Sequence, residues 1–199
     1  MNDPHAFWNW FRSAHVRLQN LRGGRDDALL DEIQTRLQDC SPGLWFEVGG
    51  HPEGPMELII SAEGDPNYFA DVRQLVGSAP AIPGWQFIAF KPPQGFEFQT
   101  EYEGVVVNPA TSWFLPLESK SDPTAVGLRV AVPGFTQERG QDFRTAVYIV
   151  LDTGLGELAA SETIQHLEVV APPSKPEDDG YIELNELGSY LEWKARREA

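Results

Sequence analysis

The most informative stretch of the chain, residues 56–93, reads MELIISAEGDPNYFADVRQLVGSAPAIPGWQFIAFKPP. Apolar runs at 56–62 and from Trp85 onward predict two short strands. Between them, Asp65-Pro66 predicts a helix start, because aspartate is a preferred N-cap and proline fits the first helical position. The apolar residues that follow have helical spacing: Tyr68, Phe69, Val72, Leu75 and Val76. Alternation along the last strand places Trp85, Phe87 and Ala89 on one face and Gln86, Ile88 and Phe90 on the other.

The same order of elements recurs later in the chain. A strand at 44–48 precedes the opening stretch, and a second series follows with strands at 112–117 and 127–132, a helix at 141–153 and a strand at 166–170. Each series opens on Trp-Phe, at 45–46 and 113–114, and closes on Pro-Pro, at 92–93 and 172–173. Proline cannot donate to a sheet ladder, so both last strands end alike. We predict pseudo-repeat halves at about 44–94 and 112–174; the alternative is that a common order and two dipeptides match by chance.

Helices are predicted at both ends of the chain. Helical spacing covers about 3–38 with a stop at Gly23-Gly24, and Trp8 and Trp10 lie off its apolar stripe, which indicates cover on more than one side. At the other end, about 183–197, three side chains are available to dock: Leu187, Leu191 and Trp193. The predicted fold class is therefore α+β, a single domain over 1–199 with a mainly antiparallel sheet from two similar halves, and the terminal helices packed on it. A cleft between the halves is where a ligand is expected.

Charge and cysteine content narrow the function classes. The net charge is −15, from 30 acidic and 15 basic residues, which disfavours nucleic acid and anionic membrane surfaces as partners. A basic protein or a small molecule remains a possible partner. Cys40 is the single cysteine, so an internal disulfide and a cysteine-based zinc site are excluded. With no signal-like or membrane-spanning segment expected, we predict a cytoplasmic protein, and we expect no cofactor; the oligomeric state stays open.

One motif resembles a catalytic loop. Residues 149–154, IVLDTG, are similar to the active-site loop of aspartic proteases, in which two such aspartates share a proton. Only one copy is present, so Asp152 would need a homodimer. The apolar spacing around it favours a helix end, with Gly154 and Gly156 as terminating residues.

Histidines and carboxylates give weaker candidates. His51 lies in a predicted loop, and Glu63 and Asp65 lie at a strand-to-helix turn. A hydrolase-like enzyme would need these three side chains to converge in three dimensions. His166 and Glu168 share a strand face and would give two metal ligands, too few to predict a metal site.

The aromatic stretch FEFQTEY, residues 96–102, alternates with acidic and amide side chains, which predicts a strand at a sheet edge. Exposed aromatics there would instead form a binding rim for a basic partner. We predict a non-enzymatic binding protein for a protein partner or small ligand; the alternatives are the hydrolase-like enzyme and a structural subunit of a larger assembly. The predicted binding residues are His51, Glu63, Lys91, Phe96, Phe98 and Tyr102.

Four segments together, FWNWF, LIISAEG, WQFIAFKPPQGF and LDTGLGE, resemble an uncharacterised bacterial protein family with no assigned activity. The resemblance covers most of the chain and implies no function. The repeated strand-strand-helix-strand order is also loosely similar to ligand-binding domains of the gyrase-inhibitor type, which is a likeness of topology alone.

Overall fold

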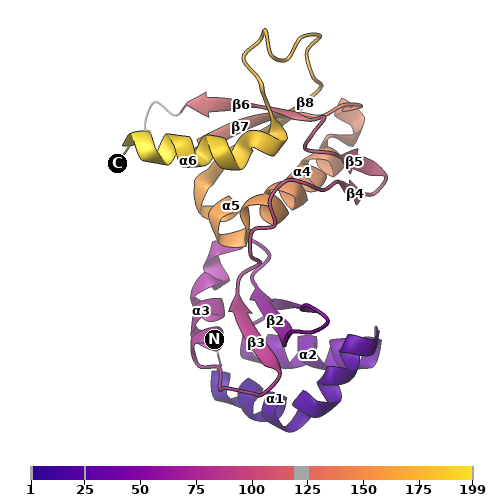
Figure 1. The fold of residues 1–199 in the computed structure, drawn as a ribbon, viewed down its shortest axis with the longest axis vertical. Coiled ribbons are helices and arrows are strands. Elements are labelled where there is room, and N and C mark those ends of the chain that lie inside the picture. Colours follow the sequence, from indigo (N-terminus) through magenta and orange to yellow (C-terminus); the bar gives the residue numbers. More distant parts are fainter. Residues whose placement is uncertain (1, 25, 119–125, 199) are drawn as a thin grey trace. The chain divides into compact units, whose positions relative to one another are not determined.

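The chain divides into two compact units, residues 1–91 and 92–199. The computed structural model describes residues 2–24, 26–118 and 126–198 (Figure 1). The fold class is α+β, as predicted, with helices at both ends of the chain. The single domain predicted for 1–199 stays a prediction.

The first unit is a three-stranded sheet with helices on one face. Its strands lie in the order β1-β2-β3, in which β1 is antiparallel to β2 and β2 is parallel to β3. The elements are α1 (Pro4–Leu18), η1 (Gln19–Gly23), α2 (Asp27–Cys40), β1 (Trp45–Gly49), β2 (Met56–Ser61), η2 (Pro66–Tyr68), α3 (Phe69–Gly77) and β3 (Trp85–Ala89). Asp65 caps η2 with proline in the next position, which confirms the predicted helix start.

Aromatic side chains form much of the core of the first unit. Phe11 of α1 lies against Trp85 and Phe87 of β3, with ring centroids 4.9 and 5.3 Å apart. Trp8 is buried as well, 4.5 Å from Phe87, and its indole Nε1 donates to the Leu75 carbonyl at 2.8 Å. The prediction that α1 is covered on more than one side is confirmed, since α3 holds Trp8 and β3 holds Phe11.

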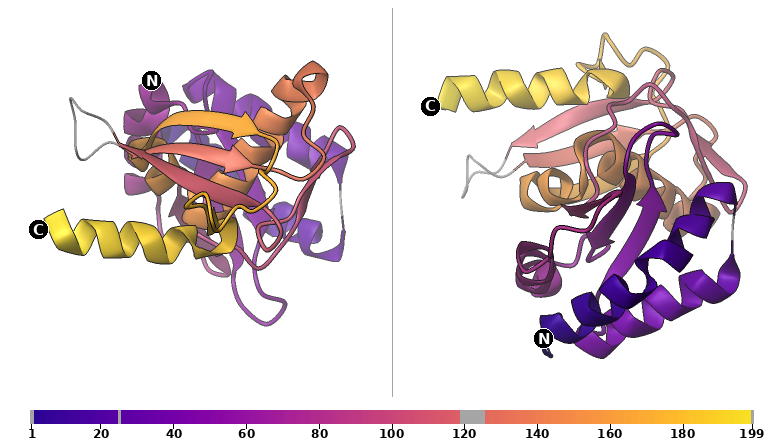
Figure 2. Two further views of the ribbon diagram at one scale, coloured as in Figure 1. Left: turned by 90° about the horizontal axis from the view of Figure 1, so that it is seen from above. Right: turned by 60° about the horizontal axis from the view of Figure 1, so that its bottom comes forward.

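The second unit contains two sheets. The antiparallel hairpin of β4 (Thr100–Tyr102) and β5 (Val105–Val107) precedes a four-stranded sheet in the order β8-β7-β6-β9. Its other elements are β6 (Trp113–Glu118), β7 (Val126–Ala131), η3 (Gln137–Arg139), α4 (Gly140–Leu155), α5 (Glu157–Thr163), β8 (Ile164–Val170), β9 (Ile182–Glu183), η4 (Leu184–Glu186) and α6 (Leu187–Glu198). Figure 2 (left) looks onto the strands of this sheet, with α4 and α5 behind them.

The core of the second unit lies between α4 and the inner face of its sheet. Alternate residues of β7, Leu128 and Val130, are fully buried and pack in one cluster with Val147 and Val150 of α4. Phe96 belongs to the same cluster and lies directly on Gly154, where any Cβ would overlap its ring. Gly154 is thus a helix residue whose missing side chain lets the Phe96 ring pack against the helix backbone. Gly156, with φ +81°, follows the end of the helix.

The two units share one strand arrangement, which supports the predicted pair of similar halves. β1 and β2 pair with Trp45 opposite Ser61, and β6 and β7 pair with Trp113 opposite Ala131. In both units the middle strand is parallel to the strand that follows the helix. The turn after the middle strand is also shared, because Gly64 and Gly134 both have φ +77°. That this similarity arose by duplication stays a prediction.

Several details differ from the sequence-based predictions. The halves carry separate sheets instead of one joint sheet. The strand predicted over 96–102 is formed only at Thr100–Tyr102, because Phe96 turns into the core. Helix α5 and strand β9 were not predicted. Trp193 is 48% exposed and does not dock, whereas Leu187 is buried. Residues 119–125, where the sequence SKSDPTA predicts a turn between the strands at 112–117 and 127–132, lie outside the described residues. Across the described part of the chain, no helix combines the length and apolar composition needed to cross a bilayer.

Candidate functional site

Four polar side chains gather at the carboxyl ends of β2 and β3 in the first unit. The Lys91 ammonium lies 2.8 Å from Glu63 Oε2 and 3.9 Å from Glu47 Oε1. The Ser61 hydroxyl accepts the backbone N–H of Glu63 at 2.9 Å. We call Glu47, Ser61, Glu63 and Lys91 the Lys91 cluster. The carboxyl ends of parallel strands are the usual place for ligands in open sheets, because loops there can diverge and present side chains.

A left-handed residue at the end of β3 aims Lys91 into this cluster. Phe90 has φ +67°, which is unfavourable for a bulky side chain. Regular alternation predicts that Phe90 lies beside Ile88, on the face of the sheet that carries no helix in this structure. Instead its ring packs on Phe69 of α3, with ring centroids 5.1 Å apart, and the guanidinium of Arg73 lies 5.3 Å above it. The inversion buries Phe90 and brings Lys91 to the face that carries Glu47.

A second left-handed residue holds the carboxylate of the cluster. Glu63 has φ +51° in the turn after β2. The second unit has the same turn, but the positions that correspond in strand pairing hold Ala131, Pro133 and Ala171 in place of Ser61, Glu63 and Lys91. Neither Pro133 nor Val170, the counterpart of Phe90, is left-handed. The shared scaffold therefore forms without left-handed residues at these two positions, and the strain at them is specific to the Lys91 cluster.

The cluster is open to solvent on its carboxylate side. The side chains of Glu47 and Glu63 are 51% and 52% exposed, whereas that of Lys91 is 16% exposed. Trp45 lies two residues before Glu47 on the same face of β1 and is 45% exposed. Two carboxylates around one ammonium leave a net negative charge beside an exposed indole. An indole face next to carboxylates attracts cations.

The chemistry of the cluster favours binding over catalysis. Ser61 is fully buried, and its hydroxyl is held by the Glu63 backbone, 3.5 Å from the Glu63 carboxylate. Nucleophilic serines need an adjacent general base and an exposed oxygen. The Lys91 ammonium is committed to carboxylates, so it offers no free base.

The trio required for a hydrolase-like enzyme does not converge. His51 precedes β2 and Glu63 follows it, so the six residues of the strand separate them by roughly 20 Å. The His51 loop is held by Arg22, whose guanidinium donates to the carbonyls of His51 and Gly54 at 3.2 and 2.8 Å. Asp65 accepts from the backbone and side chain of Asn67 at 3.0 and 2.8 Å. Of the three predicted binding residues in the first unit, Glu63 and Lys91 belong to the Lys91 cluster and His51 does not.

The three predicted aromatic binding residues lie in the second unit and do not form an exposed rim. Phe96 is 7% exposed in the core, and Phe98 and Tyr102 are partly buried against it. The predicted strand at a sheet edge is formed at Tyr102, which belongs to the two-stranded β4–β5 hairpin. The exposed aromatics that the sequence did not single out are elsewhere and include Trp45.

His166 and Glu168 form an ion-pair network with Arg129. Arg129 Nε donates to Glu168 Oε2 at 2.7 Å, and His166 Nε2 lies 3.3 Å from Glu168 Oε1. The hydrogen bond from Arg129, followed by that from His166, lowers the pKa of Glu168. Within residues 2–24, 26–118 and 126–198, no three His, Cys, Asp or Glu side chains converge as metal ligands.

Asp152 lies inside α4, with helical backbone on both sides. The aspartic-protease loop requires this residue on a loop after a strand, so the likeness at 149–154 is one of sequence only. The helix-end interpretation is confirmed for Gly156, which follows the last residue of the helix, and is wrong for Gly154, which lies within it.

Comparison of the chain with protein-family models, with curated proteins and with solved structures gives no match. The resemblance to an uncharacterised bacterial family therefore stays a prediction, and the candidate site rests on its geometry.

Proposed function

We propose that this chain is a non-enzymatic binding protein that holds a cationic group of a partner protein at the Lys91 cluster. The partner supplies a lysine or arginine side chain that reaches the carboxylates of Glu47 and Glu63, and its stem or guanidinium covers Trp45. The wider acidity of the chain attracts the same kind of partner at long range.

One observation carries this proposal. Two half-exposed carboxylates converge beside an exposed indole, next to two left-handed residues, Glu63 and Phe90, whose counterparts in the second unit are not left-handed. Left-handed non-glycine residues cost of order 1–3 kcal/mol each and cluster at binding and catalytic sites. Strain at Glu63 and Phe90 serves to aim the carboxylate and the lysine, which a structural ion pair at a relaxed position would not require.

The test is isothermal titration calorimetry with a peptide of alternating lysine and glycine. The double variant E47Q/E63Q removes two charges from the cluster, and E53Q/E57Q removes two charges from the same unit outside it. Partly exposed ion pairs contribute about 0.2–1 kcal/mol each, so we expect E47Q/E63Q to weaken binding by roughly 2- to 30-fold. W45A removes the exposed indole face, worth about 0.5–1 kcal/mol, or roughly 2- to 5-fold.

A site-specific contact predicts that E53Q/E57Q binds the peptide nearly as well as the natural chain. Equal weakening of the two double variants would mean that only the overall charge attracts the peptide, and the proposed site would be wrong. Thermal unfolding of each variant verifies that the fold is intact.

A further inference from the structure

The last helix of the second unit ends in an aromatic and basic surface. Trp193 is 48% exposed, with the Arg197 guanidinium 4.8 Å from its ring centroid and Tyr190 5.8 Å away on the other side. Arg196 is exposed beside them. We call Trp193, Arg196 and Arg197 the basic end. An arginine stacked on an exposed tryptophan is typical of protein interfaces.

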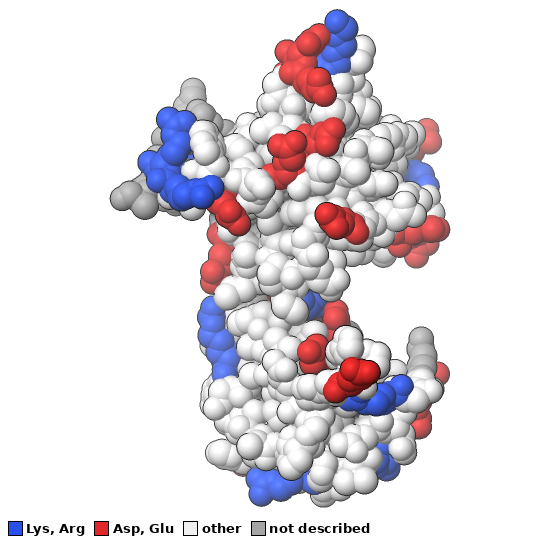
Figure 3. Space-filling view, viewed as in Figure 1, with Lys and Arg blue, Asp and Glu red and all other residues white. Residues whose placement is uncertain are grey.

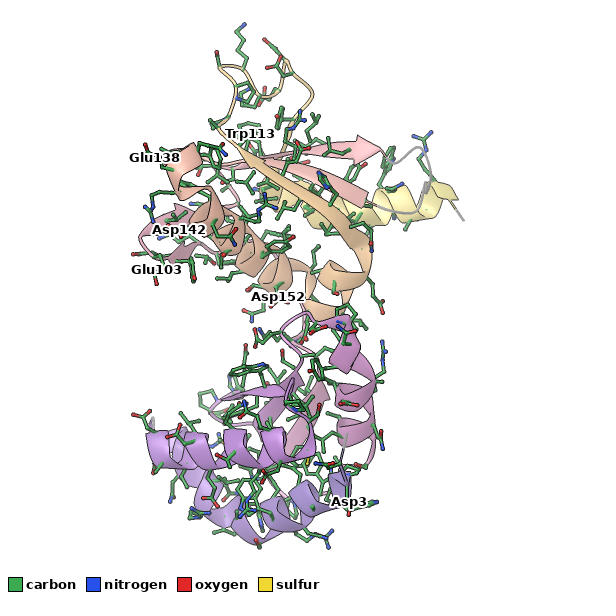
Figure 4. All side chains as sticks on the ribbon, turned by 180° about the vertical axis from the view of Figure 1, so that it is seen from behind. Asp3, Glu103, Trp113, Glu138, Asp142 and Asp152 are labelled. Carbon is green, nitrogen blue, oxygen red and sulfur yellow. The ribbon has the colours of Figure 1, made fainter. Side chains whose placement is uncertain are left out.

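An acidic surface lies elsewhere in the same unit. Glu103 in the β4–β5 turn and Glu138 in η3 are exposed, and Asp142 lies in the first turn of α4. Arg139 joins these elements, because its guanidinium donates to the Glu103 carbonyl and to Asp142 Oδ2, the latter at 3.1 Å. We call Glu103, Glu138 and Asp142 the acidic end; Figure 4 shows their side chains along one side of the unit.

Apolar surface continues from the acidic end along α4. Ile149 lies seven residues after Asp142, which is two helical turns and about 10 Å along the same face. It is 36% exposed, and the neighbouring Tyr148 is 50% exposed. The α4 face therefore offers carboxylates and, beyond them, an apolar platform. The basic end offers the complementary pair, guanidinium groups and an aromatic ring.

We propose that the basic end of one chain docks on the acidic end and α4 face of a second copy, so that the protein associates head to tail. The occupant is a second copy because both complementary surfaces belong to this chain and lie at opposite ends of one compact unit (Figures 1 and 4). Figure 3 shows a group of basic side chains, in blue, at the place of the C-terminal end of α6 in Figure 1, on the far side of the unit from the β4–β5 hairpin. A contact between two different surfaces is heterologous. Each chain of such a pair therefore keeps one of its two surfaces, the basic end or the acidic end, unoccupied.

The net charge of −15 opposes this contact over long distances. The second unit holds 18 of the 30 acidic and 8 of the 15 basic residues, so its copies repel each other at low ionic strength. At about 0.15 M salt the Debye length is about 8 Å, which screens the overall repulsion more than contacts at bonding distance. Association is therefore expected to increase from low salt to about 0.15 M and to fall again in concentrated salt.

The experiment is sedimentation velocity of the full chain over a range of concentrations at that ionic strength. We expect the average mass of the natural protein to rise with concentration above the 22.2 kDa of one chain. R196E/R197E and E103K/E138K each remove one side of the contact, and each is expected to lower the association constant at least about tenfold. R12E/K175E makes the same change of net charge as R196E/R197E at exposed cations elsewhere and is expected to associate like the natural chain.

Mixing the two defective variants distinguishes this contact from any other. R196E/R197E keeps a natural acidic end and E103K/E138K keeps a natural basic end, so an equal mixture restores the natural contact between unlike variants, and its average mass should rise above that of either variant alone. A natural chain that stays monomeric at every concentration would overturn the proposal. So would a mixture that stays monomeric, or either variant associating as the natural chain does. These variants lie outside the Lys91 cluster, so their failure leaves the proposed function untouched.

Discussion

Replacing Glu63 by glycine and by glutamine separates the strain at the Lys91 cluster from its charge. Both variants remove the carboxylate that Lys91 contacts at 2.8 Å, so both lose the same ion pair. Glu63 is half exposed, and such a pair contributes about 0.2–1 kcal/mol. Only glycine removes the left-handed penalty at φ +51°.

The expected difference follows from two opposing terms. A left-handed L-residue costs about 1–2 kcal/mol, a penalty that glycine avoids. Glycine in turn loses more backbone entropy on folding, which destabilises the E63G variant by about 0.5–1 kcal/mol. With the middle of each range, E63G should therefore be more stable than E63Q by about 0.75 kcal/mol. For a chain of this length that corresponds to roughly 1–4 °C in melting temperature.

Differential scanning calorimetry measures this difference, and Glu57 provides the matched control. Glu57 lies in the β2 strand, where glycine destabilises, so E57G should melt below E57Q. We also expect E63G to lose peptide binding while it gains stability over E63Q. If E63G melts at or below E63Q while the Glu57 pair behaves as described, the backbone at residue 63 is not strained, and the argument for the site fails.

Three further predictions concern single contacts. G154A should destabilise by about 1–3 kcal/mol because its methyl group overlaps an aromatic ring, whereas G140A in the same helix, with open space around its Cβ position, should be neutral or stabilising; urea unfolding of both measures the contrast. The hydrogen bond from Arg129 lowers the pKa of Glu168 in the folded state. The stability that this pair adds is therefore fully present above the ordinary pKa of glutamate, and it is lost as the pH falls through the lowered pKa of Glu168. The stability difference between the natural chain and R129Q should thus exist at neutral pH and vanish in acid; a difference that persists in acid would contradict it. Burial raises the pKa of the Cys40 thiol, so a thiol reagent should label it far more slowly in the folded chain than in urea, and equal rates would refute the burial.

The order of elements was predictable because local chemistry determines it. Asp65-Pro66 marks a helix start through an N-cap and a fixed φ, and the apolar spacing of residues 68–76 gives the buried face of α3. The Trp-Phe and Pro-Pro pairs correctly aligned the two halves, because each occupies an equivalent place in strand pairing.

The Lys91 cluster was only half predictable. Glu63 and Lys91 were selected, but alternation assigns Phe90 to the helix-free face, and one left-handed residue reverses the faces of Phe90 and Lys91. No local sequence pattern predicts a left-handed backbone at a residue other than glycine. Glu47 was missed because its role depends on strand pairing with β2, which the sequence of β1 alone does not fix.

The contiguity of the first unit has a consequence for synthesis. All of its strands and helices come from residues 1–91, including the α1 tryptophan that α3 anchors. The ring contacts of its aromatic core are made within these residues, and domains in general fold in the order in which they leave the ribosome. The nascent chain can therefore complete its first hydrophobic core, with the Lys91 cluster at the strand ends, while the rest is still being translated.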